Sequence, residues 1–257
     1  MDFTLTPEQQ LLADGLGKFL DARYDLQASR EAVKVGAGWQ PEIWRALADE
    51  LGVIGACLPE AVGGDDGGPE ELMVVTEALG HALVVEPFVD SVVLGARLLH
   101  ATGAEPALAA ARRIAAGEAV SALAALEDSS GGVLSRIATS ADRDGDGWVI
   151  NGTKAVVTSA PIADYLIVSA RTAGEPDDPP GVSLFLLELG DNAPAGLTSH
   201  PLRTIDDRVA ADLVFTDVRV PADALIAESA IDLLERAWDC LLYTSDAADE
   251  RPRVDFG

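Results

Sequence analysis

The residues that could do chemistry in this chain gather at the end of one β-favouring stretch. Residues 147–158 contain a short apolar run, an Asn151-Gly152 pair, and a second run that leads into the hydroxyls of Thr158 and Ser159. Asn-Gly supplies the positive φ angles of a tight two-residue turn, so the stretch is predicted to form a β-hairpin. A strand-end hydroxyl can hydrogen-bond a ligand. Taken alone, however, Thr158 favours a structural role over a functional one.

Acid–base and metal chemistry find little support in the spacing of the other polar residues. Glu127 has no histidine or second acid fixed near it in sequence, which favours a hydrogen-bonded or solvated carboxylate over a base. Arg203 and Arg219 could serve ligand phosphates, but surface positions are the favoured interpretation. The three histidines show no ligand spacing, and two cysteines are too few for a disulfide framework. We therefore expect no metal site and assign no catalytic residue.

Composition excludes several classes of partner. The chain has 257 residues, of which 48% are apolar, so a packed core is expected rather than disorder. Its net charge of -25 argues against nucleic acid and against anionic membrane surfaces. An acidic, polar N-terminus and the lack of a long apolar run predict neither a signal peptide nor a membrane span. The expected protein is soluble and cytoplasmic.

The front of the chain is predicted to be helical. Thr6 is placed as an N-cap, Pro7 takes the first helical position, and Gln9 completes a capping box. An apolar stripe at helical spacing follows, formed by Leu11, Leu12, Leu16, Phe19 and Leu20. A second helix is predicted to begin at Pro41 and to end at Gly52. Its inward residues are expected to be Ile43, Trp44, Leu47 and Leu51.

Further helical runs are predicted over 69–82, 87–102 and 105–117, and the character of the sequence then changes. Seven short β-rich runs separated by Gly, Asp and Pro clusters follow, over residues 121–126, 134–140, 148–150, 155–158, 165–170, 183–189 and 209–215. No helical pattern lies between them, which is typical of a sandwich or barrel. A helical pattern starts again near Ala230.

The predicted fold class is therefore α+β: an N-terminal helical bundle followed by a middle β-sandwich or barrel domain. We place the helical domain at 1–118, the β domain at 119–228, and the start of a further helical domain at 229–239. Trp39, Trp44 and Trp148 are expected to anchor the cores.

Four motifs in this order resemble the signatures of the acyl-CoA dehydrogenase family. Residues 58–64 (LPEAVGG) match its PExxGG signature, and residues 77–80 (EALG) match its E-x-L-G. Residues 151–164, from the Asn-Gly pair to Ala-Asp, resemble its NGxKxWIT…AD block. Residues 215–221 resemble its strand ending in V-x-V-P. Each motif alone is weak, but their shared order and spacing over residues 1–239 make the resemblance strong.

The resemblance implies a fold and a reaction. The family has N-terminal helices, a middle β domain and a C-terminal four-helix bundle, and this last part is expected to be missing here. FAD lies between the β domain and the bundle. A carboxylate base takes the α-proton of an acyl-CoA thioester, and a hydride passes from the β-carbon to the flavin. The implied partners are an acyl-CoA substrate, an electron-transfer acceptor, and further subunits in a homo- or hetero-oligomer.

The resemblance also assigns cofactor-binding residues. Thr158 matches the threonine that faces the flavin, and Val157 lies where backbone approaches the ring. Leu126 stands where the family has a threonine, which leaves only its backbone N–H as a donor. Val156 stands where the family has a tryptophan, which removes stacking area. Such losses occur in divergent members that pair with a complementary subunit.

Three functions stay open on these grounds. The first is a truncated flavin-dependent acyl-CoA dehydrogenase, itself inactive as a fragment because the catalytic base belongs to the missing bundle. The second is a non-catalytic structural subunit of a heteromeric dehydrogenase, which Leu126 and Val156 favour. The third is another flavoenzyme on the same scaffold, such as an oxidase or a hydroxylase.

The last residues differ in style from the rest of the chain. Read back into codons, residues 240–250 resemble a transposase-based sequencing adapter translated in frame. We therefore expect residues 240–257 to be adapter read-through, which belongs outside fold reasoning. The alternative is an ordinary acidic tail.

Overall fold

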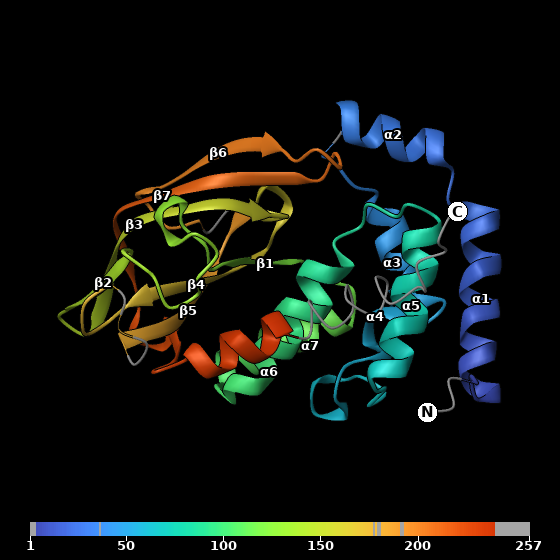
Figure 1. Ribbon diagram of the computed structural model, residues 1–257, viewed down its shortest axis with the longest axis horizontal. Helices are drawn as coiled ribbons and strands as arrows, with labels where there is room; N and C mark the ends of the chain where they lie inside the picture. The colour runs from blue at the N-terminus through green and yellow to red at the C-terminus, as the bar shows by residue number, and fades with distance from the viewer. Residues whose placement is uncertain (1–3, 36, 177, 179–180, 191–192, 240–257) are drawn as a thin grey trace, which may run out of the picture.

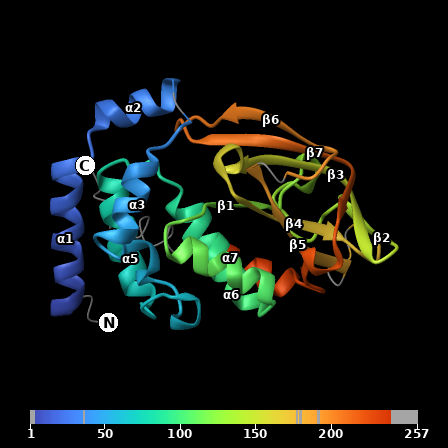
Figure 2. The same ribbon diagram turned by 180° about the vertical axis from the view of Figure 1, so that it is seen from behind.

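The computed structural model describes residues 4–35, 37–176, 178, 181–190 and 193–239. Helices occupy one side of the molecule and a β-sheet the other, with α6 and α7 where the two meet (Figure 1; Figure 2 shows the reverse side). The helices are α1 (Pro7–Arg23), α2 (Leu26–Val35), α3 (Pro41–Asp49), α4 (Val53–Ala56), α5 (Pro69–His81), the π-helical η2 (Val89–Ala96), α6 (Arg97–Thr102) and α7 (Glu105–Ala115). Short 3-10 turns are η1 (Glu60–Val62), η3 (Asp128–Ser130), η4 (Ala160–Ile162) and η7 (Ala222–Ala224).

Helix α1 begins as the sequence predicts. The Thr6 hydroxyl accepts a hydrogen bond from the Gln9 N–H at 3.2 Å, and the Gln9 side chain accepts one from the Thr6 N–H at 2.9 Å. Leu16 and Phe19 are buried, but the predicted apolar stripe is too wide, because Leu11 is 72% exposed. The exposure of Leu11 places it on the outward side of α1, and the helix packs on α5.

Helix α3 begins at Pro41 and buries Ile43, Trp44 and Leu47, as predicted. It is the third helix rather than the second, because α2 precedes it. Gly52, the predicted stop, has φ 65° in the left-handed region that favours glycine. The other predicted helical runs correspond to α5, to η2 with α6, and to α7.

The strands form one hydrogen-bonded sheet in the order β6-β7-β3-β2-β4-β5-β8, with β1 paired to β4. They are β1 (Ser121–Ala124), β2 (Ser140–Asp144), β3 (Gly147–Thr158), β4 (Tyr165–Arg171), β5 (Val182–Glu188), β6 (Leu197–Arg203), β7 (Val209–Val220) and β8 (Leu225–Ala227). The β1–β4 pairing is parallel, and the other extended ladders are antiparallel. The sheet bends back so that β6, β7 and β3 lie over β4 and β5 (Figure 1).

The predicted hairpin at Asn151-Gly152 is wrong. Strand β3 runs through this pair from Gly147 to Thr158, and the register against β7 shifts between Ile150 and Gly152. Gly152 therefore lies in a β-bulge with φ 144°. The tight turn comes earlier, at Gly145 and Asp146, where Asp144 of β2 pairs with Gly147 of β3.

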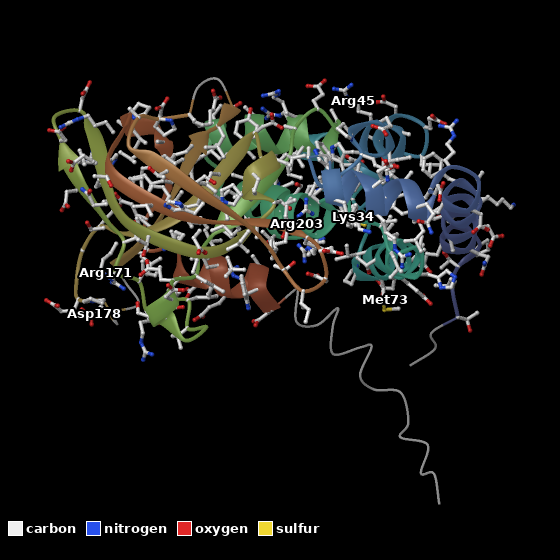
Figure 3. The ribbon with its side chains drawn as sticks, turned by 90° about the horizontal axis from the view of Figure 1, so that it is seen from above. Lys34, Arg45, Met73, Arg171, Asp178 and Arg203 are labelled. Carbon is white, nitrogen blue, oxygen red and sulfur yellow. The ribbon has the colours of Figure 1, made fainter. Side chains whose placement is uncertain are left out.

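The predicted strand over 134–140 is also wrong for all but its last residue. Ser140 begins β2, whereas the preceding residues form a loop. Arg171 holds this loop, because its guanidinium donates to the Ser135 carbonyl at 2.8 Å and to the Ile137 carbonyl at 3.1 Å. The same guanidinium donates to the Asp178 carbonyl at 2.7 Å, and Figure 3 shows the two side chains near one another. Buried apolar residues in this loop imitate a strand pattern.

Two apolar cores lie on opposite faces of β4. Ile167 packs with the helices, whereas Leu166 and Val168 pack inside the bent sheet. A strand buried on both faces carries a continuous apolar run, as β4 does. Strands β6 and β8 were not predicted, and β6 is mostly exposed and polar at the sheet edge.

Residues 231–239 are helical, as predicted, and Leu234 in this helix is fully buried. Among the described residues it is the only helix after the sheet, so the four-helix bundle implied by the resemblance is not among them. The expected adapter read-through at 240–257 lies outside the described residues. The predicted fold class is confirmed: a helical front part followed by a mostly antiparallel β domain. No described helix combines the length and the apolarity needed to cross a bilayer.

Candidate functional site

A buried ion pair lies beside the candidate site and holds part of it in place. The Lys154 ammonium on β3 lies 2.9 Å from Glu127 Oε1 and donates to the Ser169 hydroxyl at 3.1 Å. The two charged side chains are 0% and 4% exposed. Glu127 also accepts the N–H groups of Ala138 and Thr139, at 2.8 and 3.0 Å. The hydrogen-bonded interpretation of Glu127 holds, and the solvated one is wrong because the carboxylate is buried.

Burial and charge act in opposite directions on this pair. Burial lowers the pKa of Lys154 to about 8, although the Glu127 charge raises it. Burial raises the pKa of Glu127, but the Lys154 charge and the hydrogen bonds hold that pKa below its usual value. A carboxylate satisfied in this way is a structural anchor and not a base.

The anchor holds Leu126 beside the end of β3. The Leu126 carbonyl accepts the Ala155 N–H at 3.0 Å, which ties the segment between β1 and η3 to β3 next to Val156. Leu126 is half-buried, and its side chain packs against the helical core. The structure thus brings Leu126 close to the β3 segment that the sequence selected.

Val156 is held in an unusual conformation. Its φ of 49° is rare for a β-branched residue, and its side chain is 52% exposed. The Val156 N–H donates to the Asp212 carboxylate on β7 at 2.8 Å, within the second register shift of β3. Val157 points the other way and is buried inside the bent sheet. The bulge therefore presents position 156 outward.

Thr158 ends β3 and contacts the helical part of the molecule through Asp90 of η2. The Thr158 hydroxyl donates to Asp90 Oδ1 at 2.7 Å, and the Ser159 hydroxyl donates to Oδ2. Arg208, in the turn between β6 and β7, places Nη2 2.7 Å from the same Oδ2. Asp90 is only 3% exposed, so these three donors satisfy a buried carboxylate.

Sequence reasoning missed Asp90 and Arg208. Asp90 lies 68 residues before Thr158, and Arg208 lies 118 residues after Asp90, so no local spacing connects the three residues. No motif names either residue. Only the docking of η2 against the ends of β3 and β7 brings them together.

The chemistry that this site offers is hydrogen bonding. A hydroxyl carries one proton, and Thr158 gives it to Asp90, so its remaining capacity is to accept. Asp90 already receives three donors and is paired with Arg208, so it is not a free base. Among the described residues, no group of three His, Cys, Asp or Glu side chains is placed to hold a metal ion.

The residue types at the end of β3 are compatible with contact to one side of a flavin ring. Exposed Val156 and half-buried Leu126 offer apolar surface for a ring face, and the Thr158 oxygen offers an acceptor for a ring N–H. They would hold the ring by contact area and by a single side-chain hydrogen bond, since the Val156 N–H is already taken by Asp212.

Two family models match the chain, in the order of its two parts. The acyl-CoA dehydrogenase N-terminal domain matches residues 6–124, and the acyl-CoA dehydrogenase middle domain matches residues 122–218. The chain belongs to the acyl-CoA dehydrogenase family.

Relatives of the chain include characterised and structurally solved proteins. Acyl-CoA dehydrogenase FadE27 of Mycobacterium tuberculosis is 33% identical over 74% of this chain and 48% of its own length. Benzylmalonyl-CoA dehydrogenase of Aromatoleum aromaticum is 32% identical over 73% of this chain and 49% of its own length. The chain therefore spans about half the length of these curated relatives.

Solved structures share the fold. A putative acyl-CoA dehydrogenase from Mycobacterium smegmatis superposes with a TM-score of 0.82 at 29% identity, covering 93% of this chain and 63% of that one. The ChsE4-ChsE5 complex from Mycobacterium tuberculosis gives 0.81 at 27% identity, covering 96% and 64%.

Proposed function

We propose that the chain is the N-terminal and middle part of a cytoplasmic, flavin-dependent acyl-CoA dehydrogenase. In this proposal, FAD supplies the redox chemistry that removes hydrogen from the α- and β-carbons of an acyl-CoA thioester. The division into a helical unit at 1–118, a β unit at 119–228 and the start of a further helical unit at 229–239 belongs to the same proposal. No catalytic base is assigned among the described residues.

The observation that carries the proposal is the fixed arrangement at the end of β3. Leu126, Val156 and Thr158 are held by backbone and side-chain hydrogen bonds within the protein. Preorganised groups bind a rigid ring with little further loss of entropy. Leu126, Val156, Val157 and Thr158 are therefore proposed as the cofactor-binding residues, with Val157 anchoring the segment from inside the sheet.

A second function, a non-catalytic subunit that completes a partner's site, is favoured by a specific observation. Thr158 commits its proton to Asp90, and Val156 presents less surface than an aromatic ring would. Both features weaken the contacts that this chain offers to a flavin. Several structural neighbours are complexes, including ChsE4-ChsE5 and Tcur3481-Tcur3483, which supports a hetero-oligomeric assembly. An electron-transfer acceptor remains part of the first proposal.

FAD titration of the purified chain tests the first proposal. Binding is followed by quenching of flavin fluorescence, and we expect Thr158→Val to weaken it about 5- to 10-fold, because one hydrogen bond of roughly 1 kcal/mol is lost. Thr198→Val is the matched control, since Thr198 is exposed on the edge strand β6. Equal binding by wild type and Thr158→Val contradicts the assigned role of Thr158. The same titration on the full-length protein, with its C-terminal bundle present, separates the two functions: a full-length protein that does not quench the flavin contradicts the first function and favours the second.

A further inference from the structure

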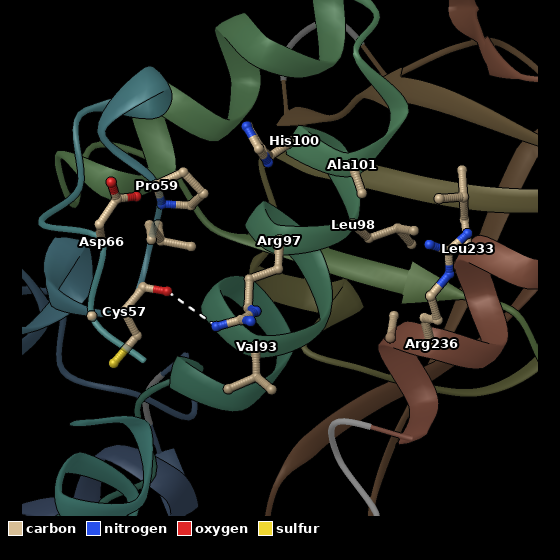
Figure 4. A pocket seen from close by; sticks show the side chains of 13 residues that line it. Cys57, Pro59, Asp66, Val93, Arg97, Leu98, His100, Ala101, Leu233 and Arg236 are labelled. Carbon is tan, nitrogen blue, oxygen red and sulfur yellow. Dashed lines mark hydrogen bonds between the residues drawn. The ribbon is translucent and has the colours of Figure 1, made fainter. Parts of the chain in front are cut away.

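A cavity lies between the loop after α4, helix α6 and the helix of residues 231–239 (Figure 4), and the residues at the end of β3 do not line it. Its volume is about 320 Å³, near the lower end of the range for small-molecule sites. Part of its wall is apolar, formed by Pro59, Val93, Leu98 and Leu233. The cavity is therefore large enough for one small molecule with an apolar portion.

The charged residues around this cavity are mostly basic. Arg97 and His100 come from α6, and Arg236 comes from the facing helix (Figure 4). Asp66 is the only acidic residue of the lining. The whole chain carries 43 acidic residues and 18 Lys or Arg residues. The excess of basic residues around this cavity is therefore opposite to the acidic excess of the whole chain.

The acidic member of the lining is already engaged. Asp66 Oδ1 accepts the Glu60 N–H at 3.1 Å and so stabilises its own loop. Among the described residues, neither Arg97 nor Arg236 has a carboxylate within ion-pair distance. Within the described part of the chain, the two guanidiniums therefore form no ion pair with an acidic side chain.

Protein contacts orient both guanidiniums without neutralising them. Arg97 Nη1 donates to the Cys57 carbonyl at 3.2 Å, and Arg236 Nε donates to the Asp232 carbonyl at 3.0 Å. Each arginine has further N–H groups beyond the one used. Arginine presents these groups as a planar fork that matches the oxygens of a carboxylate or phosphate.

We propose that this cavity binds the anionic head group, a carboxylate or phosphate, of a small molecule whose apolar portion lies on Val93, Leu98 and Leu233. The anion is attracted by the positive charges of Arg97 and Arg236, and the half-buried position of Arg97 strengthens its attraction relative to that of a fully exposed group. The apolar wall adds affinity through buried surface. This site is independent of FAD binding at the end of β3.

Calorimetric titration with three eight-carbon probes tests the site. Octanoate and octyl phosphate carry the two candidate head groups, and octanol carries the same chain without charge. We expect at least one anionic probe to bind about 10-fold or more tightly than octanol, and to bind more weakly as chloride is raised. The stronger of the two anionic probes identifies the head group.

Variants assign the binding to this cavity. Arg97→Gln and Arg236→Gln are each expected to weaken the anionic probe about 5- to 10-fold, whereas Arg45→Gln on the exposed side of α3 leaves it unchanged. Thermal unfolding checks that each variant is folded. Arg236 is exposed, so its variant decides the matter if Arg97→Gln fails to fold. The proposal is overturned if octanol binds as tightly as the anions, if no anionic probe binds, or if folded Arg236→Gln retains full affinity.

Discussion

At the scale of single residues, the hydrogen bonds of the Thr158 hydroxyl decide what the site can offer a ligand. Thr158, which is proposed to contact the flavin, directs its proton to Asp90. The hydroxyl can therefore accept from a ring N–H more readily than it can donate to a ring nitrogen. Ser159 and Arg208 complete the coordination of the same carboxylate, so protein groups satisfy it.

The buried pair Lys154 and Glu127 makes a direct prediction for stability. Lys154→Met leaves a buried carboxylate without its counter-charge, so we expect a loss of about 3–5 kcal/mol in the free energy of unfolding, measured by urea denaturation. Lys34→Met, at an exposed position of α2, is the matched control and is expected to change stability by less than about 0.5 kcal/mol.

A double variant separates the charge from the packing. Replacing both members, as in Lys154→Met with Glu127→Leu, removes the orphaned charge and is expected to recover much of the lost stability. A double variant as unstable as Lys154→Met would show that the loss comes from packing and not from the unpaired carboxylate.

The resemblance to family motifs assigned Leu126, Val156, Val157 and Thr158 to cofactor binding, and that assignment stays a prediction. A motif with fixed spacing can name such residues because its members lie close together in sequence. Asp90 has no such signal, because its partners Thr158 and Arg208 are distant in sequence and meet it only when the helices dock on the sheet. The burial of Lys154 could not be predicted from the sequence either, since a lysine in a strand normally indicates an exposed position.

At the scale of elements, strand pairing in the sheet overrides the turn preference of the Asn151-Gly152 pair. Asn-Gly favours a tight turn, but the earlier Gly145-Asp146 pair forms the turn, and β3 continues to Thr158 with β7 beside it. Long pairing with β7 outweighs the local preference of one dipeptide. The helix starts at Pro7 and Pro41 were predicted correctly because capping and proline act within a few residues.

Two glycine variants test this account of β3. A Cβ on Gly152 would lie 2.6 Å from the Thr139 Cα, whereas one on Gly145 meets nothing within 4 Å. We expect Gly152→Ala to cost about 3 kcal/mol and Gly145→Ala about 1 kcal/mol, the latter from its positive φ alone, in urea unfolding. Equal losses would contradict the bulge and its close approach to Thr139.

At the scale of the whole molecule, net charge and burial both set how stability depends on pH. The chain carries a net charge of -25, so repulsion among its carboxylates grows as they ionise. The Glu86 carboxyl differs from the exposed carboxylates because it is buried between the helices. Glu86 Oε1 accepts the Gln40 N–H at 3.1 Å, and the neighbouring Tyr24 hydroxyl accepts the Val85 N–H at 2.9 Å. This cluster joins the ends of α1 and α5 to the segment before α3.

Burial raises the pKa of Glu86 from 4.5 to about 7, and the folded state therefore keeps its proton over a range where the unfolded chain has lost it. The free energy of unfolding consequently falls as pH rises from about 4.5 to about 7, by roughly 3 kcal/mol from this group. Glu86→Gln keeps a neutral side chain of similar shape and removes this slope. Urea unfolding of wild type and of Glu86→Gln at about pH 5 and about pH 7.5 gives the change in unfolding free energy of each protein. Repulsion among the other carboxylates affects both proteins equally, so it cancels when the two changes are subtracted. A wild type and a Glu86→Gln variant that lose the same stability over this range would show that Glu86 is ionised in the folded protein.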